Sequence, residues 1–126
     1  MNFLKNLLLL AFLIGNFQSR AQTETKIYDP SADASRDISM AVEKAKQQNK
    51  HVLIQAGGNW CKWCIEFNRF CNNDAGIDSL LKASFVVYHL NYSKENKNEK
   101  VFEEFLFPQR FGFPVFIVLD ANGKHL

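Results

Sequence analysis

The hydrophobic positions along this chain predict helices that alternate with strands. Ile38, Val42 and Ala45 recur at the spacing of one helix face, after a Ser35 that can cap the helix. The segment at 51–56, with the short apolar run Val52-Leu53-Ile54, is typical of a buried strand. The same patterns predict a helix that opens at Trp60-Cys61, a short helix at 77–83, a strand at 85–90, a helix at 101–107 and a strand at 113–119. This order indicates an α/β domain with some parallel strand pairing.

The first 21 residues have the pattern of a secretory signal peptide. Lys5 precedes an unbroken apolar run at 7–14, and Ser19-Arg20-Ala21 offers small residues for cleavage between Ala21 and Gln22. The run is far shorter than the ~20 apolar residues of a membrane span. We therefore expect export to the periplasm or secretion; an uncleaved amphipathic anchor is the alternative. Residues 22–36 form a polar lead-in with one short strand near 27–28, and residues 37–126 form the domain.

Composition and charge narrow the functional classes. A chain of 126 residues, 47% hydrophobic and with 12 Phe, can build the core of one domain. The whole chain carries 15 basic and 13 acidic residues, but Lys5 and Arg20 belong to the targeting segment. The exported part has no net charge, which argues against a nucleic-acid partner.

The motif Trp60-Cys61-Lys62-Trp63-Cys64 carries the most chemistry. At a helix N-terminus, unpaired N–H groups and the helix dipole stabilise a thiolate, so we expect Cys61 to be the nucleophile. Cys64, one turn further into the helix, suits the resolving role. Lys62 adds a nearby positive charge, and Trp60 and Trp63 offer a flat apolar surface to a substrate.

Two other interpretations of the cysteines stay open. In an exported protein, Cys61 and Cys64 could form a purely structural disulfide. Zinc requires four ligands, and Cys71 would be only a third, with no histidine nearby in sequence, so we expect no metal. Cys71 follows the apolar residues Ile65, Phe67 and Phe70, which predicts a buried, inert thiol; a third redox-active thiol is the alternative.

The order of these parts resembles the thioredoxin superfamily, most closely its exported members with a Trp-Cys-x-Trp-Cys active site. Besides the cysteine motif, the resemblance rests on Gly112-Phe113-Pro114 before a strand that ends in Leu119-Asp120-x-x-Gly123, and it spans residues 38–126. It implies a central mixed β-sheet flanked by helices. It also implies a thiol–disulfide oxidoreductase that needs no cofactor, acts on protein disulfides or dithiols, and exchanges electrons with a membrane protein.

The resemblance also assigns the Phe113-Pro114 pair. In the family the matching proline is cis and lies against the active-site disulfide, so Phe113 would face the substrate. Without the resemblance, a trans proline at a strand start would be the expectation, since only about 5–6% of X–Pro bonds are cis.

Two departures from the family pattern qualify the resemblance. Thioredoxins carry a buried acid six residues before the first cysteine, where this chain has Gln55. A water, another side chain or Glu66 would have to accept the proton from the resolving thiol. The chain also stops at Leu126, just after the turn at 120–123, so the final hairpin and C-terminal helix look incomplete. We expect an open apolar sheet face, left by truncation or covered by the N-terminal segment or a partner.

The sequence leaves the direction of electron transfer open among reductase, oxidase and isomerase. Two rival functions also remain. One is a non-catalytic thioredoxin-fold binding module with a structural Cys61–Cys64 disulfide, which Gln55 and the early stop both favour. The other is an accessory protein that handles heme or metal.

Overall fold

The computed structural model describes residues 25–126. The signal peptide expected at 1–21 therefore lies outside the described residues. The elements are, in chain order, α2 (Ala34–Gln48), β1 (His51–Gly57), α3 (Lys62–Asn73), α4 (Ala75–Ser84), β2 (Phe85–Asn91), α5 (Glu99–Glu104), the 3₁₀ helix η1 (Pro108–Phe111) and β3 (Val115–Leu119). No helix within this part of the chain has both the length and the hydropathy to cross a membrane.

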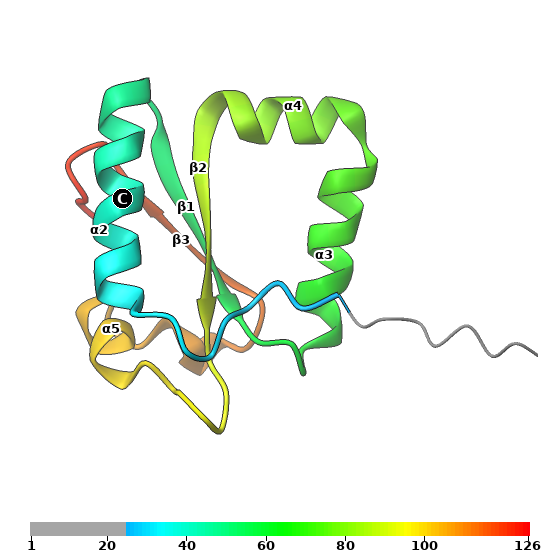
Figure 1. Ribbon diagram of the computed structural model, residues 1–126, viewed down its shortest axis with the longest axis vertical. Helices are drawn as coiled ribbons and strands as arrows, with labels where there is room; N and C mark the ends of the chain where they lie inside the picture. Colours follow the sequence, from blue (N-terminus) through cyan, green and yellow to red (C-terminus); the bar gives the residue numbers. More distant parts are fainter. Residues whose placement is uncertain (1–24) are drawn as a thin grey trace, which may run out of the picture.

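The three strands form one mixed sheet in the order β2-β1-β3. β1 pairs in parallel with β2 and antiparallel with β3, so that Ile54 lies between Tyr88 and Ile117. α2 packs on one side of the sheet, and α3 and α4 lie on the other (Figure 1). The predicted α/β fold with a central mixed sheet flanked by helices is confirmed.

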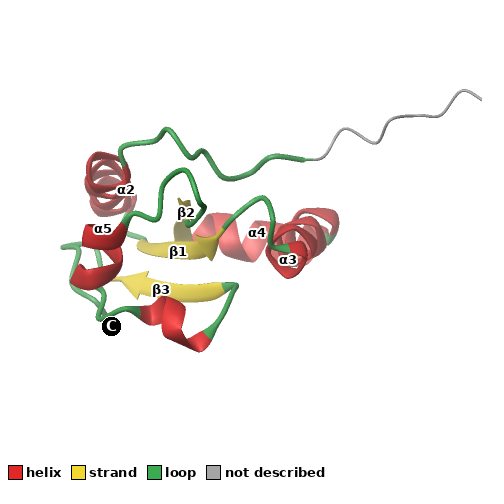
Figure 2. Ribbon diagram, turned by 90° about the horizontal axis from the view of Figure 1, so that it is seen from below, coloured by secondary structure: helices red, strands yellow, loops and turns green. Residues whose placement is uncertain are grey.

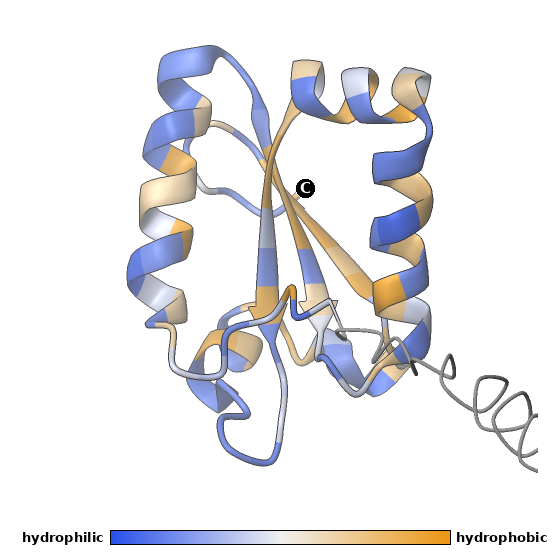
Figure 3. Ribbon diagram, turned by 45° about the vertical axis from the view of Figure 1, so that its right-hand side comes forward, coloured by the Kyte–Doolittle hydropathy of each residue, from blue (hydrophilic) through white to orange (hydrophobic). Residues whose placement is uncertain are grey.

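The main core lies between the sheet, α2 and α5. Alternate residues of β1, Val52, Ile54 and Ala56, are fully buried against the α2 residues around Ala45 and against Phe102. Side chains of a strand alternate between its two faces, so this register fixes the face that meets α2. Figure 3 shows the strands as mainly hydrophobic and the outer face of α2 as hydrophilic.

The opposite sheet face is only partly covered. Val87 on β2 is 42% exposed and Phe116 on β3 is 40% exposed, although Phe116 packs against Phe67 of α3 at 4.8 Å between ring centroids. Phe70, an apolar position of this helix pattern, is 61% exposed. Within the described residues this face is thus apolar and partly exposed, and α3 covers part of it.

The two ends of α2 are both capped, but not by the residue expected from the sequence. The Asp33 carboxylate accepts the Arg36 N–H at 3.1 Å, so the cap is Asp33 and Ser35 lies in the first turn. A carboxylate also suits the positive end of the helix dipole better than a hydroxyl. At the other end Asn49 adopts a left-handed conformation with φ of 53°.

The helix expected at 101–107 is wrong in its bounds. α5 starts two residues earlier and ends at Glu104, after which Leu106 and Phe107 have φ of 63° and 56°. Pro108 disfavours the helical conformation at the residue before it, so the chain turns and restarts as η1. Figure 2 shows α2 and α5 at one side of the sheet and α3 and α4 at the other.

The predicted turn after β3 is confirmed. The Asp120 carboxylate accepts the N–H groups of Asn122 and Lys124 at 2.8 and 2.9 Å, and these bonds lower the pKa of Asp120. Beyond the turn, the expected fourth strand is reduced to a single antiparallel bridge between Leu119 and His125.

Candidate redox site

Cys61 and Cys64 form a disulfide at the N-terminus of α3, with their Cα atoms 5.3 Å apart. Cys61 is the N-cap residue, and its Sγ accepts the Cys64 N–H at 3.2 Å. A helix N-terminus leaves its first N–H groups without intrahelical partners, so one of these donors is aimed at the outer sulfur. The same geometry would stabilise a Cys61 thiolate in the reduced protein.

The two sulfurs differ in access. Cys61 is 5% exposed and Cys64 is fully buried. An incoming thiolate from solvent can therefore reach the disulfide only through Cys61. This difference matches the outer and inner positions expected from the sequence.

Trp60 and Trp63 are both large exposed apolar residues next to the disulfide, at 59% and 70% exposure. Trp60 is held in place, because its Nε1–H donates to the Tyr92 carbonyl at 2.7 Å and its ring meets Phe113 edge-to-face at 5.5 Å. Lys62, between them in sequence, is exposed as well. The residues of the motif thus present an apolar surface with one cation at the rim of the site.

The Phe113–Pro114 peptide bond is cis, which confirms the expectation from the family resemblance. Phe113 is half-buried and packs against the cluster that contains Cys61 and Cys64, while its ring also contacts Tyr92 at 5.1 Å. The fold therefore brings Phe113, 52 positions after Cys61 in the sequence, to the disulfide.

Gln55 occupies the position at which thioredoxins carry an acid, and it is buried. Its Nε2 donates to Tyr28 Oη at 2.9 Å and to the Cys64 carbonyl at 3.0 Å. Tyr28 is also buried, and this burial raises the pKa of the phenol to about 12, against a lowering by the Gln55 hydrogen bond. The two side chains behind Cys64 are thus the neutral amide of Gln55 and the neutral phenol of Tyr28.

Sequence reasoning missed Tyr28, which it placed only in a possible short strand at 27–28. No strand forms there, because the Asn59 side chain takes the backbone groups that a strand partner would use. Asn59 Oδ1 accepts the N–H groups of Ile27 and Tyr28 at 3.0 and 3.1 Å, and Asn59 Nδ2 donates to the Tyr28 carbonyl at 2.8 Å. The only signal was an isolated apolar pair in a polar segment, which cannot identify its partner.

Gly57 and Gly58 link β1 to the disulfide because no larger residue fits. A Cβ on Gly57 would clash with Cys64 Sγ and would lie 2.8 Å from Tyr28 Oη. A Cβ on Gly58 would clash with the Trp60 ring and would lie 2.7 Å from the Tyr92 carbonyl. Close backbone approach to the site therefore requires glycine at both positions.

Cys71 is a buried free thiol, as predicted, and burial raises its pKa. It borders a cavity of about 470 Å³ between the sheet and α3, which Gln55 and His89 also line.

Glu66, considered above as a proton acceptor for Cys64, pairs with Arg69 at 3.1 Å on the surface of α3. Residues 25–126 contain no group of three or more potential metal-ligating side chains.

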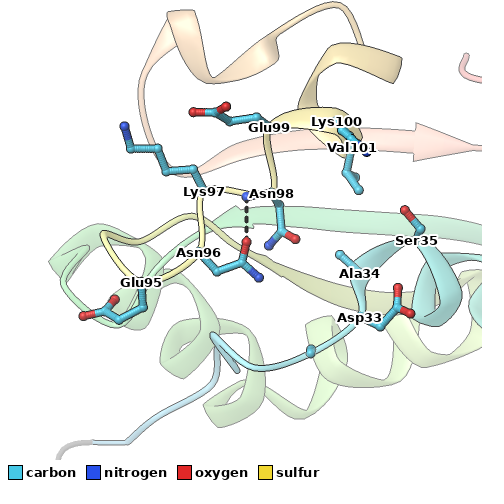
Figure 4. A pocket seen from close by; sticks show the side chains of 11 residues that line it. Asp33, Ala34, Ser35, Glu95, Asn96, Lys97, Asn98, Glu99, Lys100 and Val101 are labelled. Carbon is cyan, nitrogen blue, oxygen red and sulfur yellow. Dashed lines mark hydrogen bonds between the residues drawn. The ribbon is translucent and has the colours of Figure 1, made fainter.

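A second cavity, of about 510 Å³, lies between the start of α2 and the loop before α5. Its lining is polar and comes from Asp33, Ser35 and residues 95–101 (Figure 4). Within it the Asn98 N–H donates to Asn96 Oδ1 at 3.0 Å, the dashed line of Figure 4. None of its lining residues belongs to the cysteine motif, so it is separate from the redox site.

Comparisons with known proteins agree with this geometry. A family model described as thioredoxin-like matches residues 33–121. A disulfide bond reductase, DsbH, from Chlamydia pneumoniae is 30% identical over an alignment of 101 positions, and the alignment covers 68% of this chain and 55% of that protein. The chain thus spans about half the length of this curated relative.

Two solved structures share the fold. A disulphide isomerase from Xylella fastidiosa Temecula1 superposes with a TM-score of 0.74 at 24% identity, over 81% of this chain and 77% of that one. A structure titled DsbH Oxidoreductase gives a TM-score of 0.56 at 21% identity, over 88% and 78% of the two chains.

Proposed function

Because the chain belongs to the thioredoxin-like family, we propose that it is a thiol–disulfide oxidoreductase that acts on protein disulfides. One observation carries the proposal: a disulfide at a helix N-terminus whose outer sulfur alone is accessible and accepts a backbone N–H. The name of the Chlamydia pneumoniae relative, a disulfide bond reductase, supports reduction as the direction.

In that direction the reduced protein starts with a Cys61 thiolate. The thiolate attacks one sulfur of a substrate disulfide, the substrate S–S bond breaks, and the departing substrate sulfur leaves as a thiolate that takes a proton from water. Cys64, once deprotonated, attacks Cys61 Sγ, which breaks the mixed disulfide and releases the second substrate thiolate. The substrate gains two electrons and two protons, and the protein reaches the Cys61–Cys64 disulfide of the present structure.

The substrate-facing residues in this proposal are Trp60, Lys62, Trp63, Phe113 and Pro114. Their positions support this assignment. The tryptophans and Lys62 are exposed beside Cys61, and Phe113 packs against the buried cluster that contains Cys61 and Cys64. The cycle also requires a dithiol partner protein that reduces the Cys61–Cys64 disulfide. The signal-peptide pattern at 1–21 supports export, and in an oxidising compartment that partner would draw its electrons through a membrane protein.

The cysteine variants test this function. We expect Cys61→Ser to abolish reduction of a disulfide-bonded protein substrate, because the accessible nucleophile is lost. Cys64→Ser should instead accumulate a mixed disulfide with substrate, visible by non-reducing electrophoresis and mass spectrometry. Cys71→Ala is the matched control and should keep wild-type activity, because Cys71 lies two turns further along α3. Activity that survives Cys61→Ser would overturn the proposal.

Burial of both sulfurs, at 5% and 0% exposure, favours one alternative, a binding module with a structural disulfide. The reduction potential separates the two functions. Structural disulfides of exported proteins have potentials below about −300 mV, whereas catalytic pairs lie between about −270 and −120 mV. A redox titration of the Cys61–Cys64 pair against glutathione or dithiothreitol gives this value directly.

A further inference from the structure

The Tyr28 hydroxyl has an unused hydrogen-bond donor beside the inner sulfur, Cys64 Sγ. A phenolic O–H can donate one hydrogen bond while its oxygen accepts others. Tyr28 Oη accepts the Gln55 amide at 2.9 Å, and no hydrogen bond among residues 25–126 uses its O–H as donor. His89, whose ring lies 5.5 Å from that of Tyr28, does not take it, since His89 Nε2 is buried without a hydrogen-bond partner.

Cys64 Sγ is the sulfur that lies close to this hydroxyl. Tyr28, Cys61 and Cys64 form one buried cluster, and both Tyr28 Oη and Cys64 Sγ border the space beside Gly57 that is too small for a Cβ. Because Cys64 has no solvent exposure, water cannot solvate its sulfur. A thiolate at this position therefore needs a protein donor, since a buried charge without a hydrogen bond is costly.

Gln55 fixes the position of the Tyr28 phenol oxygen. Its side-chain nitrogen has two hydrogens, and it donates to Tyr28 Oη and to the Cys64 carbonyl. The amide therefore holds the phenol oxygen on one side and the backbone of Cys64 on the other. Asn59 holds the Tyr28 backbone from the loop that precedes the cysteines.

We propose that the Tyr28 hydroxyl donates a hydrogen bond to the Cys64 thiolate whenever the disulfide opens, and that Gln55 positions it for this role. The inference rests on the proposed oxidoreductase function and names the group that replaces the buried acid of thioredoxins. The thiol proton of Cys64 is released to solvent, the sulfur keeps its electron pair and Tyr28 keeps its own proton, so Tyr28 lowers the pKa of the thiol without becoming the base. The raised pKa of Tyr28, about 12, agrees with a phenol that stays protonated.

Other ionisable groups on the surrounding elements must be separated from Tyr28 in any pH profile. They are Cys61 at the start of α3, His89 on β2, Asp29 beside Tyr28, and Lys62, Glu66 and Arg69 on α3. Asp29 is bound to the Ser31 hydroxyl at 2.6 Å and Glu66 to Arg69 at 3.1 Å, both at the surface. Burial lowers the pKa of His89.

The test is the pH dependence of mixed-disulfide resolution in Tyr28→Phe, which keeps the ring and removes the hydroxyl. Cys61 is first joined to a chromogenic aromatic thiol, and release of that thiol by Cys64 is followed by stopped-flow absorbance. We expect the midpoint of the profile to rise by about one pH unit, so that resolution at pH 7 slows about tenfold and recovers at high pH. Tyr88→Phe is the matched control, because Tyr88 is a half-buried phenol that packs into the main core with Ile54 and Ala45.

Gln55→Met is the second variant, and it should shift the midpoint in the same direction because the phenol is no longer fixed. A Tyr28→Phe profile that matches the wild type, or one that is slower by the same factor at every pH, would overturn the inference. The same preparations separate this result from failure of the proposed function. If the wild type reduces no protein disulfide and its Cys64 never releases the aromatic thiol, the oxidoreductase function itself fails.

Discussion

Asn59 ties the leading segment to the redox site, so Asn59→Ala should release Tyr28 from behind Cys64. The side chain makes three hydrogen bonds of 2.8–3.1 Å to the backbone of Ile27 and Tyr28, across more than 30 sequence positions. The segment crosses from α3 to α2 without belonging to the sheet (Figure 1). Its attachment therefore depends on this clamp, on the buried Tyr28 ring and on the hydrogen bond from Asn96 Nδ2 to the Pro30 carbonyl at 3.1 Å.

The size of the effect follows from the three bonds. Each contributes about 0.5–1.5 kcal/mol net, and leaving a buried partner unsatisfied costs about 1–3 kcal/mol. Ile27 is half-buried, so water can replace part of what its N–H loses, whereas Tyr28 is 3% exposed. We expect Asn59→Ala to lower the free energy of unfolding by about 2–3 kcal/mol, a large share of the roughly 5–15 kcal/mol typical of a domain.

Urea unfolding followed by tryptophan fluorescence measures this loss, and trypsin cleavage after Lys26 reports local release of the segment. The matched control is Asn73→Ala, because Asn73 is an exposed residue at the end of α3 and should change stability by less than about 0.5 kcal/mol. Equal urea midpoints and equal cleavage rates in the two variants would show that Asn59 does not hold the segment.

Three further predictions concern stability. Asp74→Ala should lower the free energy of unfolding by about 1 kcal/mol, because the Asp74 carboxylate caps α4 through two backbone N–H groups at 2.9 Å. Asp74→Ser, which keeps a capping oxygen, should have a urea midpoint close to that of the wild type. An Asp74→Ala variant as stable as the wild type would refute the cap. Phe102→Ala should lower the free energy of unfolding by about 3–5 kcal/mol, because Phe102 is fully buried in the core. The control Leu106→Ala, at a residue 67% exposed, should leave stability nearly unchanged. A loss below about 1 kcal/mol in Phe102→Ala would contradict the packing. Burial lowers the pKa of His89 below its unfolded value, so the unfolded chain binds more protons just below pH ~6.5 and stability should fall as the pH drops from about 7 to 5.5. His89→Gln should make this decline shallower. An equally steep decline in His89→Gln would show that His89 does not cause it.

Local chemistry explains which elements could be predicted. The helices and strands whose apolar residues follow one clear period were correct to within about two residues, because burial of one face decides such segments. The helix at 101–107 failed where Pro108 and two left-handed residues override the apolar pattern. The Ser35 cap failed because Asp33, whose carboxylate suits the helix dipole better, lies two positions earlier.

The candidate site divides in the same way. The placement of Cys61 at a helix N-terminus followed from the motif, and the structure has it at the N-cap. Phe113 and its cis bond followed only from the family resemblance, since spacing alone favours a trans bond. Tyr28 and Asn59 could not be found from the sequence, because their roles consist of contacts to each other and to Gln55.

The sequence by itself determined the mixed α/β fold and the pair of cysteines with its inner and outer members. Those features depend on hydrophobic period and on spacing within a single helical turn. Only the tertiary structure decided what surrounds the inner sulfur, where Gln55, Tyr28 and Gly57 meet from two separate segments. The energy of a thiolate depends on these neighbours, and residues about 30 positions apart become neighbours only when the chain folds.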